Sequence, residues 1–186
     1  MSVRPDHWIE KMVETYRLIE PFEKRQMSNA VISYGLSCYG YDMRLANQFK
    51  VPRTDSLSLM DPKHLGESDY ETVETDTYVL PPHHLVLGRS VEYFRIPRNV
   101  ITVTQGKSTY ARCGILVNVT PFEPEWEGFV TIAISNISTL PAKLYAGEGI
   151  CQVLFFESDS PCRISYADKK GKYQAQQGIT PARMKK

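Results

Sequence analysis

One short stretch of the chain gathers side chains that could grip phosphate groups. Gly106 is followed directly by Lys107, Ser108 and Thr109, and Arg112 lies a few residues further on. A glycine permits close backbone approach, while hydroxyl groups and cations donate hydrogen bonds to phosphate oxygens. The stretch is not a P-loop, because that motif needs a second glycine at an upstream spacing that this chain lacks. On these residues alone, the stretch is either a phosphate-binding loop that runs into the first turn of a short helix or an exposed charged loop.

A predicted strand further along the chain has two faces of different character. It follows the Trp126-Glu127-Gly128 turn, and side chains along a strand alternate between its two faces. One face carries small side chains and the other carries apolar ones, namely Thr131, Ala133 and Ser135 against Val130, Ile132 and Ile134. We expect the apolar row to enter the core and the small row to line a pocket.

Short apolar runs separated by glycine and proline predict a mainly β protein. The runs lie at residues 77–80, 85–87, 100–103, 115–117, 129–134 and 153–156. Many short strands at this spacing are typical of a sandwich or barrel. One helix is predicted near the N-terminus, where Trp8, Met12 and Tyr16 recur at helical spacing until Pro21 ends the pattern. Residues 61–77 are polar and acidic and are predicted to form a surface excursion.

The composition restricts the classes of partner. The 186 residues suffice for one domain with a real core. With 22 basic and 21 acidic residues the formal net charge is +1, which argues against a nucleic-acid polymer as partner. No apolar run is long enough to cross a membrane, and the first residues lack a signal peptide's apolar segment, so we expect a cytoplasmic protein. A cytidine-deaminase zinc site is not expected, because Pro161-Cys162 lacks the second cysteine of that motif.

Long, ordered blocks of the sequence resemble the dCTP deaminases of the dUTPase-like superfamily. The blocks are residues 1–20, 33–42, 91–97, 106–114, 121–128 and 166–176, which together span nearly the whole chain. The resemblance implies one domain over residues 1–186, folded as a mainly β distorted barrel or jelly roll. It also implies an N-terminal helix at residues 1–20 and a C-terminal flap at residues 166–186 that folds over the bound nucleotide.

The same resemblance implies an activity and its partners. The reaction would be hydrolytic conversion of dCTP to dUTP and ammonia, feeding dUMP and dTTP synthesis without protein-bound zinc. The implied ligands are dCTP or dUTP, with Mg²⁺ bound through the triphosphate, and dTTP is a candidate inhibitor. The implied assembly is a homotrimer whose sites lie between subunits. A non-catalytic protein that binds dCTP or dUTP remains an alternative, and so does a bifunctional enzyme that carries dCTP on to dUMP.

The resemblance places the nucleotide site on specific residues of this chain. The expected substrate contacts are Lys107, Ser108, Thr109, Tyr110, Ala111, Arg112, Glu123, Thr131, Ile132, Ala133, Gln152, Tyr166, Lys172 and Gln176. Ser108 and Arg112 would lie nearest the reacting base, with Ser108 and a backbone carbonyl near Pro121 orienting the water. Glu123 would contact the sugar, and Gln152 would contact the base or phosphates unless it is an ordinary strand glutamine.

Position 133 departs from the family pattern. The family strand reads similarly to Thr-Ile-Glu-Ile-Ser-Asn, whereas residues 131–136 here read Thr-Ile-Ala-Ile-Ser-Asn. Hydrolytic deamination needs a group that accepts a proton from water and later donates it, and the family's glutamate fills that role. With Ala133 in its place, we expect this chain to bind the nucleotide but turn over little.

Three explanations for Ala133 stay open on the sequence alone. It could be an engineered substitution that removes the base, or the mark of a natural binder or regulator that has lost catalysis. Alternatively, Glu123, Glu125 or Glu127 could have taken over the role, although these side chains precede the turn. The C-terminal residues could likewise be a frayed tail or a flap, and Ala175 and Gln177 stand where the family more often has Gly and Arg.

Overall fold

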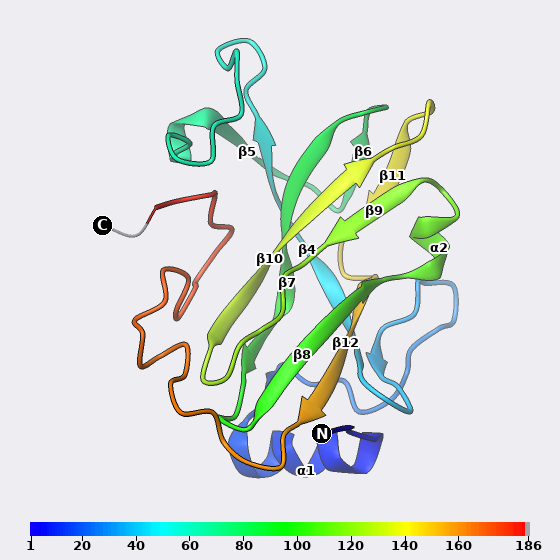
Figure 1. The fold of residues 1–186 in the computed structure, drawn as a ribbon. Helices are drawn as coiled ribbons and strands as arrows, with labels where there is room; N and C mark the ends of the chain where they lie inside the picture. The colour runs from blue at the N-terminus through cyan, green and yellow to red at the C-terminus, as the bar shows by residue number, and fades with distance from the viewer. Residues whose placement is uncertain (185–186) are drawn as a thin grey trace.

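Strands make up most of the regular structure in the computed structural model, which describes residues 1–184 (Figure 1). The helices are α1 Asp6–Tyr16, the 3₁₀ helix η1 Glu67–Asp69, and α2 Ser108–Ala111. The strands are β1 Ser2–Val3, β2 Ile19–Glu20, β3 Gly35–Leu36, β4 Tyr41–Pro52, β5 Tyr70–Glu74, β6 Thr77–Leu80, β7 Leu85–Arg95, β8 Val100–Gly106, β9 Ile115–Asn118, β10 Glu127–Asn136, β11 Ala142–Tyr145 and β12 Gly149–Glu157. The predicted mainly β fold is confirmed.

Ten of these strands form one curled antiparallel sheet. Its main path runs β1-β12-β4-β7-β10-β9, while β2, β3, β5 and β8 pair at its sides and β6 pairs with β11 separately. Register shifts interrupt β4 between Leu45 and Phe49 and β10 between Phe129 and Thr131. Such irregularities bend a strand and increase its twist, which helps the sheet to curl. Strand β9 ends this path, and β10 lies between β9 and β7.

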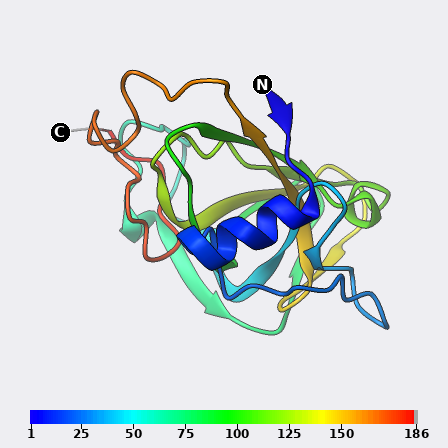
Figure 2. The ribbon, with the colours of Figure 1, turned by 90° about the horizontal axis from the view of Figure 1, so that it is seen from below.

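The inner face of the sheet holds the core, and α1 lies across its lower end (Figure 2). Ile9 on α1 is fully buried, and the Trp8 ring lies 6.3 Å from the Phe155 ring. The helix is shorter than predicted, because Arg17 adopts a left-handed conformation (φ 56°) and ends it after Tyr16. Residues 19–20 then pair with β7 as a strand, so the predicted helix boundary at residue 20 was wrong.

The predicted surface excursion at residues 61–77 contains regular structure. It includes η1 and β5, and β5 pairs with the long strand β4. Tyr70 at the start of β5 is 6% exposed, although its neighbours along the strand are polar. Pairing with β4 supplies backbone hydrogen bonds that the local composition does not reveal. Most of the segment is nonetheless exposed, so the predicted surface excursion is confirmed, and it also contains a paired strand.

The C-terminal segment, residues 166–184, packs against β10 instead of projecting into solvent. Phe129 N donates a hydrogen bond to Gln176 O at 2.9 Å, and Gly128 and Gln176 form a parallel bridge. A Cβ at Gly128, where φ is 146°, would lie 2.8 Å from Gln176 N, so only glycine allows this close approach. Residues 185–186 of the expected flap lie outside the described residues. Among the described helices, none is both long and apolar enough to cross a membrane.

Candidate functional site

A cavity of about 810 Å³ lies between β10, the loop after β9 and the C-terminal segment. Its volume falls within the range typical of small-molecule sites. Six residues of the sequence-predicted site line it, namely Glu123, Thr131, Ala133, Tyr166, Lys172 and Gln176. Strand β10 and a segment more than thirty residues later thus converge on one space, as Figure 1 shows for their backbones.

Strand β10 presents Ala133 to this cavity. Burial alternates along the strand as predicted, with Ile132 fully buried in the core and Ala133 on the opposite face. In register, Ala133 lies opposite Asn118 on β9 and Leu87 on β7. Its methyl group packs against a small apolar cluster of Tyr70, Leu87 and Ile179. Position 133 is therefore an open, partly apolar wall of the cavity, whereas the side chain of Ile132 cannot reach it.

Thr131 and Gln176 meet in one hydrogen-bond network. Gln176 Nε2 donates to Thr131 Oγ1 at 2.5 Å and to Phe129 O at 2.9 Å. The backbone N–H of Thr180 donates to the same Thr131 hydroxyl at 3.0 Å. Gln176 is 7% exposed, so these contacts hold the C-terminal segment against β10 and complete one wall of the cavity.

Charged and aromatic side chains of the C-terminal segment form another wall of the cavity. Lys169 Nζ donates to Glu123 Oε2 at 2.5 Å, and this bond raises the pKa of Lys169. The Tyr166 hydroxyl accepts a hydrogen bond from Tyr173 N at 3.0 Å, which folds the segment back on itself. Lys172 also lines the cavity, and its Nζ lies 5.0 Å from the centre of the Tyr173 ring.

The Gly106–Arg112 loop forms the predicted short helix α2, but it lies away from the cavity at Ala133. None of residues 107–112 lines the cavity at Ala133, and Figure 1 shows α2 and the C-terminal segment at opposite sides of the sheet. Thr109 lines a separate cavity of about 610 Å³ with Ser33 and Glu148. The predicted site is thus divided into two groups of residues within one chain.

In the group around α2, residues 107–112, two side chains make contacts inside the protein. Lys107 Nζ donates to Asp42 Oδ2 at 2.7 Å and to Ser33 Oγ at 2.8 Å, and Asp42 is almost fully buried. The Tyr110 hydroxyl accepts a hydrogen bond from Tyr145 N at 3.0 Å, and burial raises its pKa to about 12. Ala111, Arg112 and Ser108 are exposed around α2, so any nucleotide contact at this group would use its outer face.

Gln152 also lies away from the cavity at Ala133. It sits on β12, opposite Asp42 of β4 and Gln105 of β8 in register, and it does not line that cavity. Gln152 therefore lies near the α2 group, because its partner Gln105 is close to the end of β8, where the chain enters α2.

Comparisons with known proteins decide the family. The profile of a family described as dCTP deaminase-like matches residues 3–158. The chain belongs to this dCTP deaminase-like family. A protein named dCTP deaminase from Acidobacterium capsulatum is 59% identical over 179 residues, covering 96% of this chain and 97% of that protein. Another of that name, from Chlamydia felis, is 58% identical over 186 residues, covering 97% of this chain and 98% of that one.

A solved structure shares the fold of this dCTP deaminase-like chain. It is that of 2'-deoxycytidine 5'-triphosphate deaminase from Agrobacterium tumefaciens, with a TM-score of 0.62 and 16% sequence identity. The match covers 82% of this chain and 47% of that one. At this identity the likeness concerns the fold alone.

The three glutamates considered as replacement bases have different surroundings in this dCTP deaminase-like chain. Glu123 lines the cavity, but its carboxylate is paired with Lys169. Glu125 Oε2 accepts a hydrogen bond from Arg98 outside the cavity, and Glu127 Oε2 lies 3.9 Å from Arg95 Nε. Neither Glu125 nor Glu127 lines the cavity, so Glu123 alone of the three lies beside the space that Ala133 faces.

Sequence reasoning missed several residues of the cavity wall. Asn118 ends β9 directly opposite Ala133, and Tyr173 follows the predicted contact Lys172. Leu65 reaches the cavity from the segment predicted to form a surface excursion, and Met60 reaches it from the residue just before that segment. The position of Asn118 at the end of an apolar run was a usable signal, whereas the contacts of Met60 and Leu65 depend on long-range folding.

Proposed function

We propose that this chain binds dCTP in the cavity at Ala133 and that its hydrolytic deamination is suppressed because position 133 lacks a carboxylate. The observation that carries the proposal is the placement of Ala133, whose methyl group faces the cavity on which five other predicted contacts converge. Relatives that are 58% and 59% identical over nearly their whole length bear the name dCTP deaminase. Their chemistry supplies the substrate class for this cavity.

The proposed reaction explains why a carboxylate at position 133 matters. Water adds at C4 of cytosine, N3 gains a proton, and the C4–N bond breaks to release ammonia and leave dUTP. A base on the cavity wall must take the proton from water and deliver it to the nucleotide. The methyl group of Ala133 can do neither. General acid–base catalysis contributes about 10² to 10⁴-fold, so its loss removes most turnover while the cavity remains.

The division of the site into two groups supports assembly of the complete site between subunits. In this proposal, residues 107–112 of one copy approach the cavity of a neighbouring copy in a homotrimer. Mg²⁺ arrives bound to the triphosphate as part of the substrate, and no zinc takes part. No group of three or more His, Cys, Asp or Glu side chains among the described residues could hold a metal ion. The same site is the place where dTTP would compete.

Nucleotide binding to the unmodified chain tests the proposal first. Calorimetric titration with dCTP, dUTP and dTTP at fixed Mg²⁺ should show binding of dCTP, while assays for ammonia and pyrophosphate stay flat. Ala133→Leu, which fills the cavity wall, should weaken dCTP at least tenfold. Ser135→Leu is the matched control, because Ser135 shares the strand face but does not line the cavity.

Each of three results would contradict part of this proposal. Failure of dCTP to bind would remove the assigned substrate. Ammonia release by the unmodified chain would show that another group acts as the base, with Glu123 the first to examine. Pyrophosphate release would favour the bifunctional route to dUMP.

A further inference from the structure

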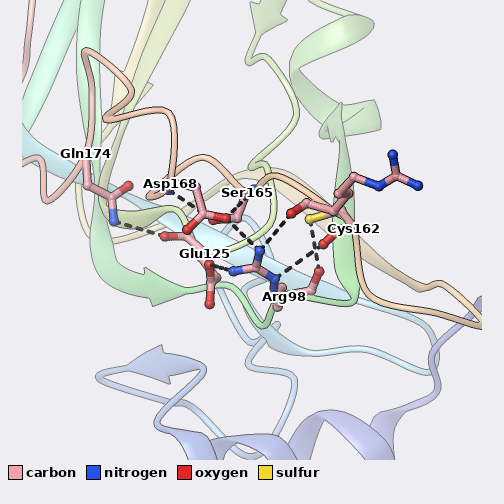
Figure 3. Close-up of polar contacts among 7 residues, drawn as sticks. Arg98, Glu125, Cys162, Ser165, Asp168 and Gln174 are labelled. Carbon is pink, nitrogen blue, oxygen red and sulfur yellow. Dashed lines mark hydrogen bonds and ion pairs between the residues drawn. The ribbon is translucent and has the colours of Figure 1, made fainter.

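Arg98 joins two parts of the chain that lie far apart in sequence. It sits in the turn between β7 and β8, just after the buried Ile96. Its Nη1 donates to Glu125 Oε2 at 2.7 Å, and its Nη2 donates to Asp168 Oδ2 at 2.6 Å (Figure 3). A planar guanidinium can bind two carboxylates at fixed angles, which a lysine amine cannot do. Arg98 therefore links the β9–β10 loop to the start of the C-terminal segment.

The same guanidinium also holds the chain that leads into the C-terminal segment. Arg98 Nε donates to Cys162 O at 3.3 Å, and Nη2 donates to Arg163 O at 3.1 Å. Asp168 Oδ2 in turn accepts a hydrogen bond from Ser165 N at 3.0 Å. The Ser165 amide and then the Arg98 guanidinium hold the pKa of Asp168 below its usual value, so the carboxylate stays charged near neutral pH. These contacts fix the turn at residues 162–168.

The loop on the other side of Arg98 carries two more attachments of the C-terminal segment. Gln174 Nε2 donates to Glu125 O at 2.9 Å, as Figure 3 shows, and Tyr166 N donates to Pro124 O at 2.9 Å. Glu125 adopts a left-handed backbone conformation (φ 60°), which turns its carbonyl and its side chain to different partners. This short loop thus accepts hydrogen bonds from the C-terminal segment at two points, while Arg98 binds the carboxylate of Glu125.

We infer that Arg98 is a positioning residue that sets the C-terminal segment over the cavity at Ala133. Arg98 does not line the cavity itself, so its effect must pass through the segment that carries Tyr166, Lys172 and Gln176. The part of this inference that concerns dCTP rests on the proposed function. Its ion pairs are partly exposed, and pairs of this kind contribute little to global stability. Loss of Arg98 should therefore loosen the segment without unfolding the protein.

The test compares Arg98→Met with Arg163→Met. Methionine keeps an unbranched apolar stem but removes the guanidinium. Arg163 is a matched control, because its exposed side chain makes no hydrogen bond or ion pair with the described residues. Hydrogen exchange without nucleotide should become about tenfold faster at residues 166–176 in Arg98→Met, with β7 and β10 unchanged. Arg163→Met should match the unmodified protein.

A second measurement separates positioning from a merely structural role. Arg98→Met should weaken dCTP binding about tenfold, and Arg98→Lys should show a smaller loss, because lysine can keep one of the two ion pairs. In the Ala133→Glu background, where turnover is expected, the KM should rise more than kcat falls. The double variant Arg98→Met/Lys172→Met should bind dCTP only slightly less tightly than whichever single variant has the lower dCTP affinity, because both changes act through the same segment.

The outcomes distinguish this inference from the proposed function. Unchanged exchange at residues 166–176 in Arg98→Met would overturn the role of Arg98. A loosened segment with unchanged dCTP affinity, or fully additive losses in the double variant, would overturn its link to the site. If the unmodified chain binds no dCTP, the proposed function fails, and the exchange comparison still decides whether Arg98 sets the segment.

Discussion

In the proposed function, the side chain at position 133 decides what the cavity can do chemically. Ala133 packs against the cluster of Tyr70, Leu87 and Ile179 and lines the cavity. The neighbouring Thr131 hydroxyl is already bonded to Gln176 and Thr180 N. The local set therefore offers shape and hydrogen bonds, but it lacks a proton acceptor at the centre of the strand face.

Tyr110 gives a prediction at the scale of one residue. Its pKa of about 12 lies above the ordinary value of 10.0, so the folded protein holds the phenolic proton more tightly than the unfolded chain does. The contribution of this shift to the free energy of unfolding is fully present below pH 10 and is lost as the pH rises from 10 to about 12. Tyr110→Phe should remove this loss. At neutral pH it should cost about 1 kcal/mol, because Tyr145 N loses its acceptor.

Urea unfolding at pH 7, 10 and 11 checks both parts of the Tyr110 prediction. Equal losses of stability between pH 10 and 11 in Tyr110→Phe and the unmodified chain would show that Tyr110 does not contribute.

At the scale of elements, local patterns predicted the strands better than the ends and pairings. The apolar runs at residues 77–80, 100–103 and 115–117 all fall within observed strands, and α2 forms where the loop was expected to enter a helix. The end of α1 and the strand β5 were missed. Arg17 ends the helix through its backbone conformation, and β5 depends on pairing with β4. Neither cause is visible in hydrophobic periodicity.

Ala175 gives a prediction about the C-terminal segment. It is exposed and has a φ of 53°, a left-handed conformation that costs a non-glycine residue roughly 1–2 kcal/mol. Ala175→Gly should relieve this strain and slow hydrogen exchange at Gln176 several-fold. Ala167→Gly is the control, because Ala167 is also exposed but is not at positive φ, so glycine there should speed exchange. Faster exchange in both variants would contradict the strain argument.

At the scale of the whole molecule, sequence reasoning predicted six residues that line one cavity, but it did not predict where the other expected contacts lie. The alternation of residues 130–135 correctly placed Ala133 beside a cavity, and the family resemblance added Tyr166, Lys172 and Gln176. The separation of residues 107–112 from that cavity depends on the curl of the sheet. The contribution of Arg98 depends on where the turn at residues 162–168 returns. Such relations arise from long-range packing, which has no local signature.

The separation predicts complementation between two different chains. One chain is unmodified, with Ala133 and an intact Arg112, and the other carries Ala133→Glu together with Arg112→Ala. Neither should turn over dCTP alone. Co-assembled in equal amounts, they should recover about a quarter of the activity of Ala133→Glu, because one site in four then combines the glutamate with Arg112 across subunits. Recovery of no activity, with mixed assemblies verified by mass, would place the whole site within one chain.

The most direct test of the account is ammonia and dUTP formation from dCTP by Ala133→Glu. The variant should bind dCTP as the unmodified chain does and should turn it over about 10² to 10⁴-fold faster. Ala133→Gln is the matched control, because glutamine has nearly the same size as glutamate but cannot accept the proton. This variant should turn over dCTP as slowly as the unmodified chain. Bound dCTP without faster turnover in Ala133→Glu, or equal turnover in all three proteins, would contradict the claim that position 133 limits this chain.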